Sequence, residues 1–119
     1  SQVKKVYKTA SGNYVFELGA NGFGINGAHY YNPSGKQIEL KASATKDGKI
    51  IAVLTTAQYE SENIGDACAK ESFYSQFNGK TEADYGDIEG ISGATITTSG
   101  YKTAIAKVFE AVKILEGVA

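Results

Sequence analysis

The sequence contains no methionine, and only one cysteine, one histidine and one proline among its 119 residues. With Cys68 as the single cysteine, a disulfide within the chain is excluded. The single histidine, His29, has no neighbouring cysteines or suitably spaced carboxylates, so it does not make a metal site, and we expect it at the surface or in a turn. Because an initiator methionine is missing, we expect the chain to be a piece excised from a longer anchored or secreted protein.

Strong charge and long apolar runs are also missing. The formal net charge is −1, which gives no electrostatic reason to expect a nucleic-acid partner. No apolar run approaches the length that spans a bilayer, and no secretory signal peptide is present. The length of 119 residues predicts one domain over residues 1–119. Any membrane association is expected to come from segments outside this chain.

The first third of the chain indicates strands and a glycine-rich loop. Residues 3–9 and 13–18 are typical of strands, and a turn at residues 11–13 would join them into an amino-terminal hairpin. The glycine-rich run at residues 19–27 predicts a loop. It resembles a nucleotide-binding glycine loop only superficially, because residues 28–33 do not continue as a helix.

The strongest strand signal lies in a central hairpin. Residues 37–45 alternate, which predicts a strand with one apolar face formed by Ile38, Leu40, Ala42 and Ala44. Asp47 and Gly48 predict a two-residue turn. Residues 50–56 return as a strand whose weaker alternation predicts a more central place in the sheet.

Two helices complete the expected fold. Residues 64–77 form the first, with an apolar stripe of Ile64, Ala67, Cys68, Phe73 and Phe77, and residues 99–116 form the second. The stripe of the second helix contains Tyr101, Ala104, Ile105, Val108, Ala111, Val112 and Leu115. The fold class is therefore α+β: a mainly antiparallel sheet, made from the amino-terminal and central hairpins, packed with these two helices. Cys68 is interpreted as a small buried residue, with a reactive thiol as the alternative.

An acidic segment separates the two helices. Residues 80–90 contain Glu82, Asp84, Asp87 and Glu89. Four carboxylates could hold a hard cation, but their spacing does not match the EF-hand loop. A solvated acidic loop is the preferred interpretation, and no metal site is expected.

The most informative stretch, residues 92–95, reads Ser-Gly-Ala-Thr and leads into the last helix. Its small residues would let a ligand approach the backbone closely. Four hydroxyls follow within five positions, at Thr95, Thr97, Thr98 and Ser99. The unpaired N–H groups of a helix start suit a phosphate, which indicates an anion site. From the residues alone, however, an ordinary capped helix start is the preferred interpretation.

These residues resemble the FMN-binding domain found in the G subunit of Rnf electron-transport complexes and in the C subunit of sodium-translocating NADH:quinone reductases. The resemblance covers roughly residues 22–115 and is strongest over residues 92–98. Weaker matches lie at residues 59–65, at residues 47–50 and at residues 77–80. The second and third of these weaker matches carry no chemistry.

The resemblance implies a cofactor site. In that family the final threonine of the Ser-Gly-Ala-Thr motif is esterified to the phosphate of FMN, and here that residue is Thr95. Its motif neighbours are Ser92, Gly93, Ala94, Ile96, Thr97 and Thr98. The family usually has Asp where this chain has Glu89, and it has Glu-Thr-Pro-Gly where this chain has residues 60–63, so Glu60 is expected to face the flavin. Thr97 and Thr98 are expected to cap the helix instead of accepting flavin.

The expected function is electron transfer by covalent FMN in a membrane-associated redox system on the extracytoplasmic side of a bacterial cell, or at the cell surface. The partners implied are a flavin transferase and other redox subunits or domains. FMN would supply the redox chemistry. No catalytic triad, metal cluster or acid–base pair is visible, so the domain is expected to be an electron carrier and not an autonomous enzyme. Two alternatives are a binding or structural module of the same fold without flavin, and a reductase that holds FMN noncovalently.

Overall fold

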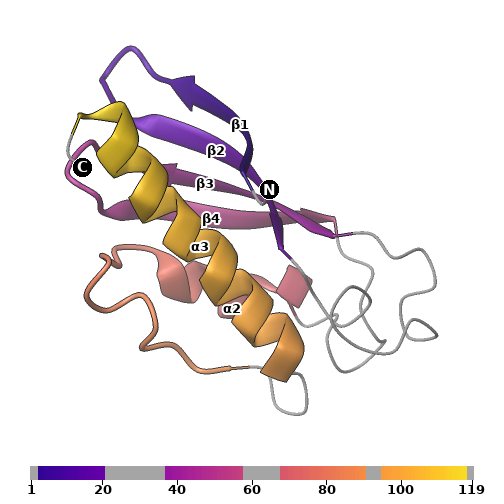
Figure 1. Cartoon of the computed structure of the whole chain (residues 1–119). Coiled ribbons are helices and arrows are strands. Elements are labelled where there is room, and N and C mark those ends of the chain that lie inside the picture. The colour runs from indigo at the N-terminus through magenta and orange to yellow at the C-terminus, as the bar shows by residue number, and fades with distance from the viewer. Residues whose placement is uncertain (1–2, 21–36, 58–67, 91–94, 118–119) are drawn as a thin grey trace.

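The computed structural model describes residues 3–20, 37–57, 68–90 and 95–117 (Figure 1). Within these ranges the chain forms one antiparallel sheet in the order β1-β2-β3-β4, two α-helices and a short 3₁₀ helix. The bounds are β1 Val3–Lys8, β2 Tyr14–Ala20, β3 Ile38–Ala44, β4 Ile50–Ala57, α2 Glu71–Tyr74, η3 Ser75–Phe77 and α3 Thr95–Leu115. This arrangement confirms the expected α+β fold with both hairpins.

The two hairpins are closed by two loops of the same type. In each, a threonine accepts a backbone bond from a glycine three residues later, Gly12 to Thr9 at 3.0 Å and Gly48 to Thr45 at 3.0 Å. Both glycines have positive φ, 91° and 84°, which a residue with a side chain rarely adopts. The loops therefore have three residues, with the glycine last, and the predicted two-residue turn at Asp47 and Gly48 is wrong.

β4 is an edge strand, so its predicted central position is also wrong. Its register against β3 shifts between Ser43, which pairs with Ala52, and Ala44, which pairs with Ile50. Ile51 is the extra residue, and it bulges out with 43% of its surface exposed. A bulge interrupts the two-residue period, which explains the weak alternation of this strand without a central location.

One face of the sheet carries the core. Every second residue of β3 is buried, as predicted, and the same is true of β2. The buried side chains of these two strands are Tyr14, Phe16, Leu18, Ala20, Ile38, Leu40, Ala42 and Ala44. Helix α3 crosses this face diagonally (Figure 1) and covers it with Tyr101, Ala104, Ile105, Val108, Phe109 and Val112, all buried. This confirms the predicted burial of Ile105, Val108 and Val112 against the sheet.

The helix predicted over residues 64–77 is much shorter in the described part of the chain. Only one α-helical turn, α2, is present, and it continues as η3; residues 64–67 lie outside the described ranges. Two serines, Ser72 and Ser75, together with Tyr74, have modest helix propensity, which is consistent with a short helix. Phe73 and Phe77, four positions apart, are the two buried side chains of this unit, and Cys68 is buried beside it.

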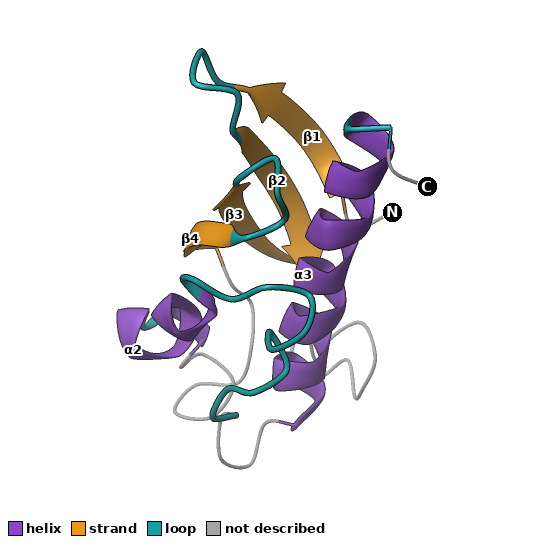
Figure 2. Ribbon diagram, turned by 90° about the vertical axis from the view of Figure 1, so that its left-hand side faces the viewer, coloured by secondary structure: helices purple, strands orange, loops and turns teal. Residues whose placement is uncertain are grey.

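The edge of β4 is covered by the residues that follow η3. Ile50 donates to the Lys80 carbonyl at 2.8 Å and accepts from the Gly79 amide at 2.7 Å. The Asn78 side chain adds an acceptor for the Val53 amide at 3.0 Å. The motif matches at residues 47–50 and 77–80 are therefore neighbours in space (Figure 2), where the loop after η3 runs beside β4.

The last turn of α3 is tied to the beginning of β2. The Tyr14 hydroxyl donates to the carboxylate of Glu116. This hydrogen bond, helped by burial, raises the pKa of Tyr14 above its ordinary value of 10.0, because the carboxylate favours the protonated phenol. The contact joins the residue after α3 to the beginning of β2. Within the described ranges, no helix combines the length and the apolarity that a membrane crossing needs.

The buried stripe of α3 predicts a large effect of Val108→Asp. The substitution places an unpaired carboxylate where the side chain has no exposure, and we expect it to lower the free energy of unfolding by at least ~3 kcal/mol. Urea unfolding followed by circular dichroism measures this. Thr103→Asp, at an exposed position of the same helix, should cost less than ~1 kcal/mol. Equal stabilities for the two variants would contradict this packing.

Candidate functional site

The beginning of α3 lies at one end of the sheet, together with the ends of three strands. The register pairs Ala20 with Ile38 and Glu39 with Ala57, so β2 and β4 finish, and β3 begins, at the same end. The hydrogen bond between Glu116, directly after α3, and Tyr14 places the carboxyl end of α3 near the beginning of β2, so α3 begins toward the opposite end of the sheet (Figure 1). The backbone of Thr95, the last residue of the motif predicted to bind phosphate, therefore lies toward the end where β2 and β4 finish.

Helix α3 begins at Thr95, earlier than the predicted start near residue 99. Thr97 and Thr98 consequently lie inside the first turns and not before them, and their predicted capping role is wrong. Both are buried, with 1% and 6% of their surface exposed, because they face the core side of the helix. Ser99 is exposed. The apolar residues that follow at helical spacing indicate the body of this helix but not its first turn.

The first turn of α3 suits an anion chemically. The first four N–H groups of any α-helix have no partner within the helix, and the helix dipole makes this end positive. No acidic residue lies in the first turn of α3 to neutralise that charge. With 21 residues, the helix is long enough to carry a full dipole. A phosphate group would fit this donor set.

Glu89 is brought to the same place by the side chain of Gln76. The Glu89 amide donates to Gln76 Oε1 at 2.7 Å, and Gln76 Nε2 donates to the Glu89 carbonyl at 2.9 Å. The next residue, Gly90, lies so close to α3 that a Cβ atom there would be 3.3 Å from Thr98 Cγ2. The residue at the family's aspartate position therefore lies beside the first turns of α3, with its side chain exposed.

A buried hydroxyl pair supports α3 two turns into the helix. The Tyr101 hydroxyl lies 2.5 Å from Thr55 Oγ1, which in turn donates to the Cys68 carbonyl at 2.7 Å. The Tyr101 ring packs edge-on against Phe73 with 5.0 Å between centroids, and it stacks on Phe77. The contacts join β4, the α2–η3 unit and α3 close to the site.

Sequence reasoning missed the contact of Gln76 with Glu89 and that of Tyr101 with Thr55. It assigned Tyr101 to the apolar stripe because this residue falls at the helical spacing of the stripe, and it assigned Gln76 to the end of a helix. A hydroxyl in an otherwise apolar stripe was a usable signal, because a buried tyrosine hydroxyl needs a partner. The partnership between Gln76 and Glu89 spans thirteen residues, and no local pattern contains it.

Two carboxylates of the acidic segment, those of Asp84 and Glu82, bind other groups of the domain. Asp84 Oδ1 accepts from the Thr81 amide at 2.7 Å and from the Thr81 hydroxyl at 3.2 Å, and these bonds lower the pKa of Asp84 below its ordinary value. Glu82 pairs with Lys113 at 2.5 Å. Within the described ranges, no three side chains of the histidine, cysteine, aspartate or glutamate types come together as a group that could hold a metal ion.

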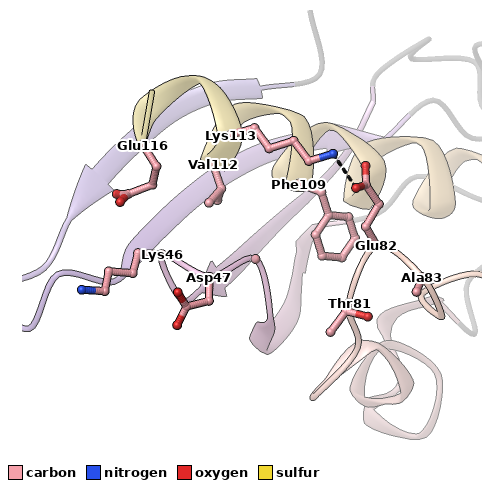
Figure 3. Close-up of a pocket in the computed structure, with 10 residues that line it drawn as sticks. Lys46, Asp47, Thr81, Glu82, Ala83, Phe109, Val112, Lys113 and Glu116 are labelled. Atoms are coloured by element: carbon pink, nitrogen blue, oxygen red, sulfur yellow. Dashed lines mark hydrogen bonds and ion pairs between the residues drawn. The ribbon is translucent and has the colours of Figure 1, made fainter. Parts of the chain in front are cut away.

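A separate cavity of about 600 Å³ lies at the other end of the domain (Figure 3). Its walls come from the β3–β4 loop, residues 81–83 and the last turns of α3, with Phe109 and Val112 among its lining residues. The sequence did not predict it. The Glu82–Lys113 pair borders the cavity. Because the last turns of α3 line it, this cavity is remote from Thr95.

Several predicted site residues fall outside the described part of the chain. These are Glu60, Ser92, Gly93 and Ala94, together with His29 and most of the glycine-rich run at residues 19–27. For Thr95 and Ile96 the helical backbone is described and the side chains are not. Of the predicted site, the structure therefore brings together Glu89, Thr97 and Thr98 with the backbone at Thr95.

The hydroxyl pair beside α3 predicts coupling between Tyr101→Phe and Thr55→Val. Each substitution should cost about 1 kcal/mol, because each removes the same hydrogen bond. Together they should cost less than the sum, with an interaction energy of about 0.5 kcal/mol or more. Urea unfolding of the double-mutant cycle measures this. Tyr101→Phe combined with Thr45→Ala, which affects the distant β3–β4 loop, should be additive, and additivity in both cycles would contradict the pairing.

Comparison with known protein families identifies the family of this chain. The chain matches the family model for the FMN-binding domain over residues 34–110. No curated protein is similar enough to count as a match. The matched region contains β3, β4, α2, η3 and most of α3, including the helix start that suits a phosphate. Because the match covers well over half of its length, the chain belongs to the FMN-binding domain family, and FMN is its cofactor.

Proposed function

We propose that this domain carries electrons with an FMN held covalently through a phosphoester to Thr95. The observation that carries the proposal is the position of Thr95 as the first residue of α3. The family's acceptor threonine then stands at the positive end of the helix. The hydroxyls of Thr97 and Thr98, the nearest competitors, are buried, so a modifying enzyme has little access to them.

The chain's own residues contribute attachment and electrostatics. Thr95 Oγ1 would form a bond to phosphorus and lose its proton, while the phosphoanhydride of a flavin dinucleotide breaks and the nucleoside monophosphate leaves. The phosphodiester keeps one negative charge, which the N–H groups of the first turn of α3 would stabilise. Bound FMN supplies the redox chemistry.

The wider setting follows from the same resemblance. We propose that a flavin transferase modifies the domain on the extracytoplasmic side of a bacterial membrane, or at the cell surface. Its electron donors and acceptors would be redox subunits or domains of an Rnf-type or NADH:quinone reductase-type system. Membrane attachment would come from segments outside this chain. A fractionation of native cells with an antibody to the domain tests the location.

Covalent attachment predicts that Thr95→Ala abolishes flavin fluorescence in a denaturing gel after co-expression with a flavin transferase. Thr95→Ser keeps an acceptor hydroxyl and should retain the fluorescence. Thr103→Ala removes an exposed hydroxyl from the same helix and should also retain it. The stability of Thr95→Ala should stay within ~1 kcal/mol of the parent. Peptide mass mapping identifies the modified residue.

Each other outcome has a defined meaning. Fluorescence that persists in Thr95→Ala, or a flavin on exposed Ser99, would refute Thr95 as the acceptor. A parent that binds FMN but releases it on denaturation would favour a noncovalent reductase. A parent without any flavin would favour a module that is not flavinylated, and Glu89→Asp would then be the first substitution to restore the family's residue.

A further inference from the structure

We propose that Gln76 is a positioning residue for flavinylation, because its side-chain amide holds the backbone of Glu89 at the entry to the segment that leads to Thr95. This inference rests on the proposed function, in which Thr95 is the acceptor. Gln76 itself lies in η3 and does not belong to the family motif at residues 92–98. Its role would be to fix the position of the backbone at Glu89, six residues before Thr95.

The Gln76 amide makes an unusually complete contact with a single residue. Its oxygen accepts the Glu89 N–H at 2.7 Å and its nitrogen donates to the Glu89 carbonyl at 2.9 Å, as two paired strands would do. The same nitrogen also donates to the Phe73 carbonyl at 3.2 Å within its own helical unit. One hydrogen bond would hold only one of the two peptide groups that flank the Glu89 Cα atom, whereas these two bonds hold both.

The next residue lies close to α3. A Cβ atom at Gly90 would be 3.3 Å from Thr98 Cγ2 and 3.4 Å from Thr98 Oγ1. The backbone is therefore bonded to η3 at Glu89 and lies beside the first turns of α3 at Gly90, five residues before Thr95 begins the helix.

Backbone hydrogen bonds do not replace this contact. Among those between described residues, the last one before α3 joins the Asp87 amide to the Asp84 carbonyl at 3.0 Å. The backbone polar groups of Glu89 are instead held by a side chain that is half-buried on η3. Removing that amide releases the entry to the acceptor segment while leaving the sheet, η3 and α3 in place.

The expected consequence is on recognition by the transferase. A backbone that is already held at Glu89 loses less freedom when the transferase binds than one that is released there. The bond-forming step occurs at Thr95 in the transferase active site, so its rate should not change. Loss of two hydrogen bonds should raise the KM of the domain as a substrate about tenfold, at constant kcat.

The test compares Gln76→Ala with Asn78→Ala in the purified domain. Asn78 is a matched control, because its side-chain amide also bonds to a backbone N–H, that of Val53 at 3.0 Å, but faces β4 and not the acceptor segment. Initial rates of flavin transfer from FAD are measured against domain concentration. Gln76→Ala should raise KM about tenfold, and hydrogen exchange should become faster in the peptide that contains Glu89. Asn78→Ala should leave both values at those of the parent.

A third variant tests the contact where the alanine variant fails to fold. Gln76→Glu keeps an acceptor for the Glu89 amide but has no donor for the Glu89 carbonyl when it is ionised. Its KM should therefore lie between those of the parent and Gln76→Ala. The difference from the parent should shrink as the pH falls toward the carboxyl pKa, because the protonated acid regains a donor.

The possible outcomes separate this inference from the proposed function. If the parent is flavinylated, and Gln76→Ala and Gln76→Glu have the same KM and the same hydrogen exchange as the parent, the inference alone is overturned. Equal increases of KM in Gln76→Ala and Asn78→Ala also overturn it, since general loss of stability would then explain the effect. A parent that accepts no flavin overturns the proposed function and this inference together.

Discussion

The packing of α3 on one face of the sheet is the interaction on which the rest of the domain depends. The helix buries six apolar side chains against the alternate residues of β2 and β3, and this is the dominant favourable contribution to folding. The bond between Tyr14 and Glu116 joins the end of the helix to the beginning of β2. Packed in this direction, α3 has its first turn toward the end of the sheet where β2 and β4 finish. The cofactor site is therefore a consequence of how the core is packed.

Much of this arrangement could be predicted because it is encoded in local periodicity. The alternation from Ile38 to Ala44 identified the buried face of β3, and the apolar spacing from Tyr101 to Val112 identified the stripe of α3. The bulge at Ile51 could not be predicted in this way, because it depends on the pairing of β4 with β3. The bulge weakens the alternation of β4, and this weak alternation led to the wrong prediction of a central strand. The apolar pattern also suggested a longer helix than α2 and η3 form among the described residues.

The site was predicted less completely than the fold. Its motif indicated Thr95 and the neighbouring hydroxyls, but spacing alone could not show that the helix begins at Thr95 or that Thr97 and Thr98 face the core. The contact of Gln76 with Glu89 depends on how η3 lies relative to the acidic loop. Contacts between distant segments arise from packing, and a single sequence contains no local signal for them.

The covering of β4 by the residues after η3 has a consequence for association between molecules. An uncovered edge strand offers unpaired N–H and C=O groups to a strand of another chain, which leads to aggregation. The contacts of Ile50 with Gly79 and Lys80 occupy that part of the β4 edge. Among the described strands, β1 forms the opposite edge and carries Lys4, Lys5 and Lys8, and repulsion between lysines disfavours the addition of a second copy. In the described part of the sheet, one edge is thus protected at Ile50 by backbone pairing and the other by positive charge.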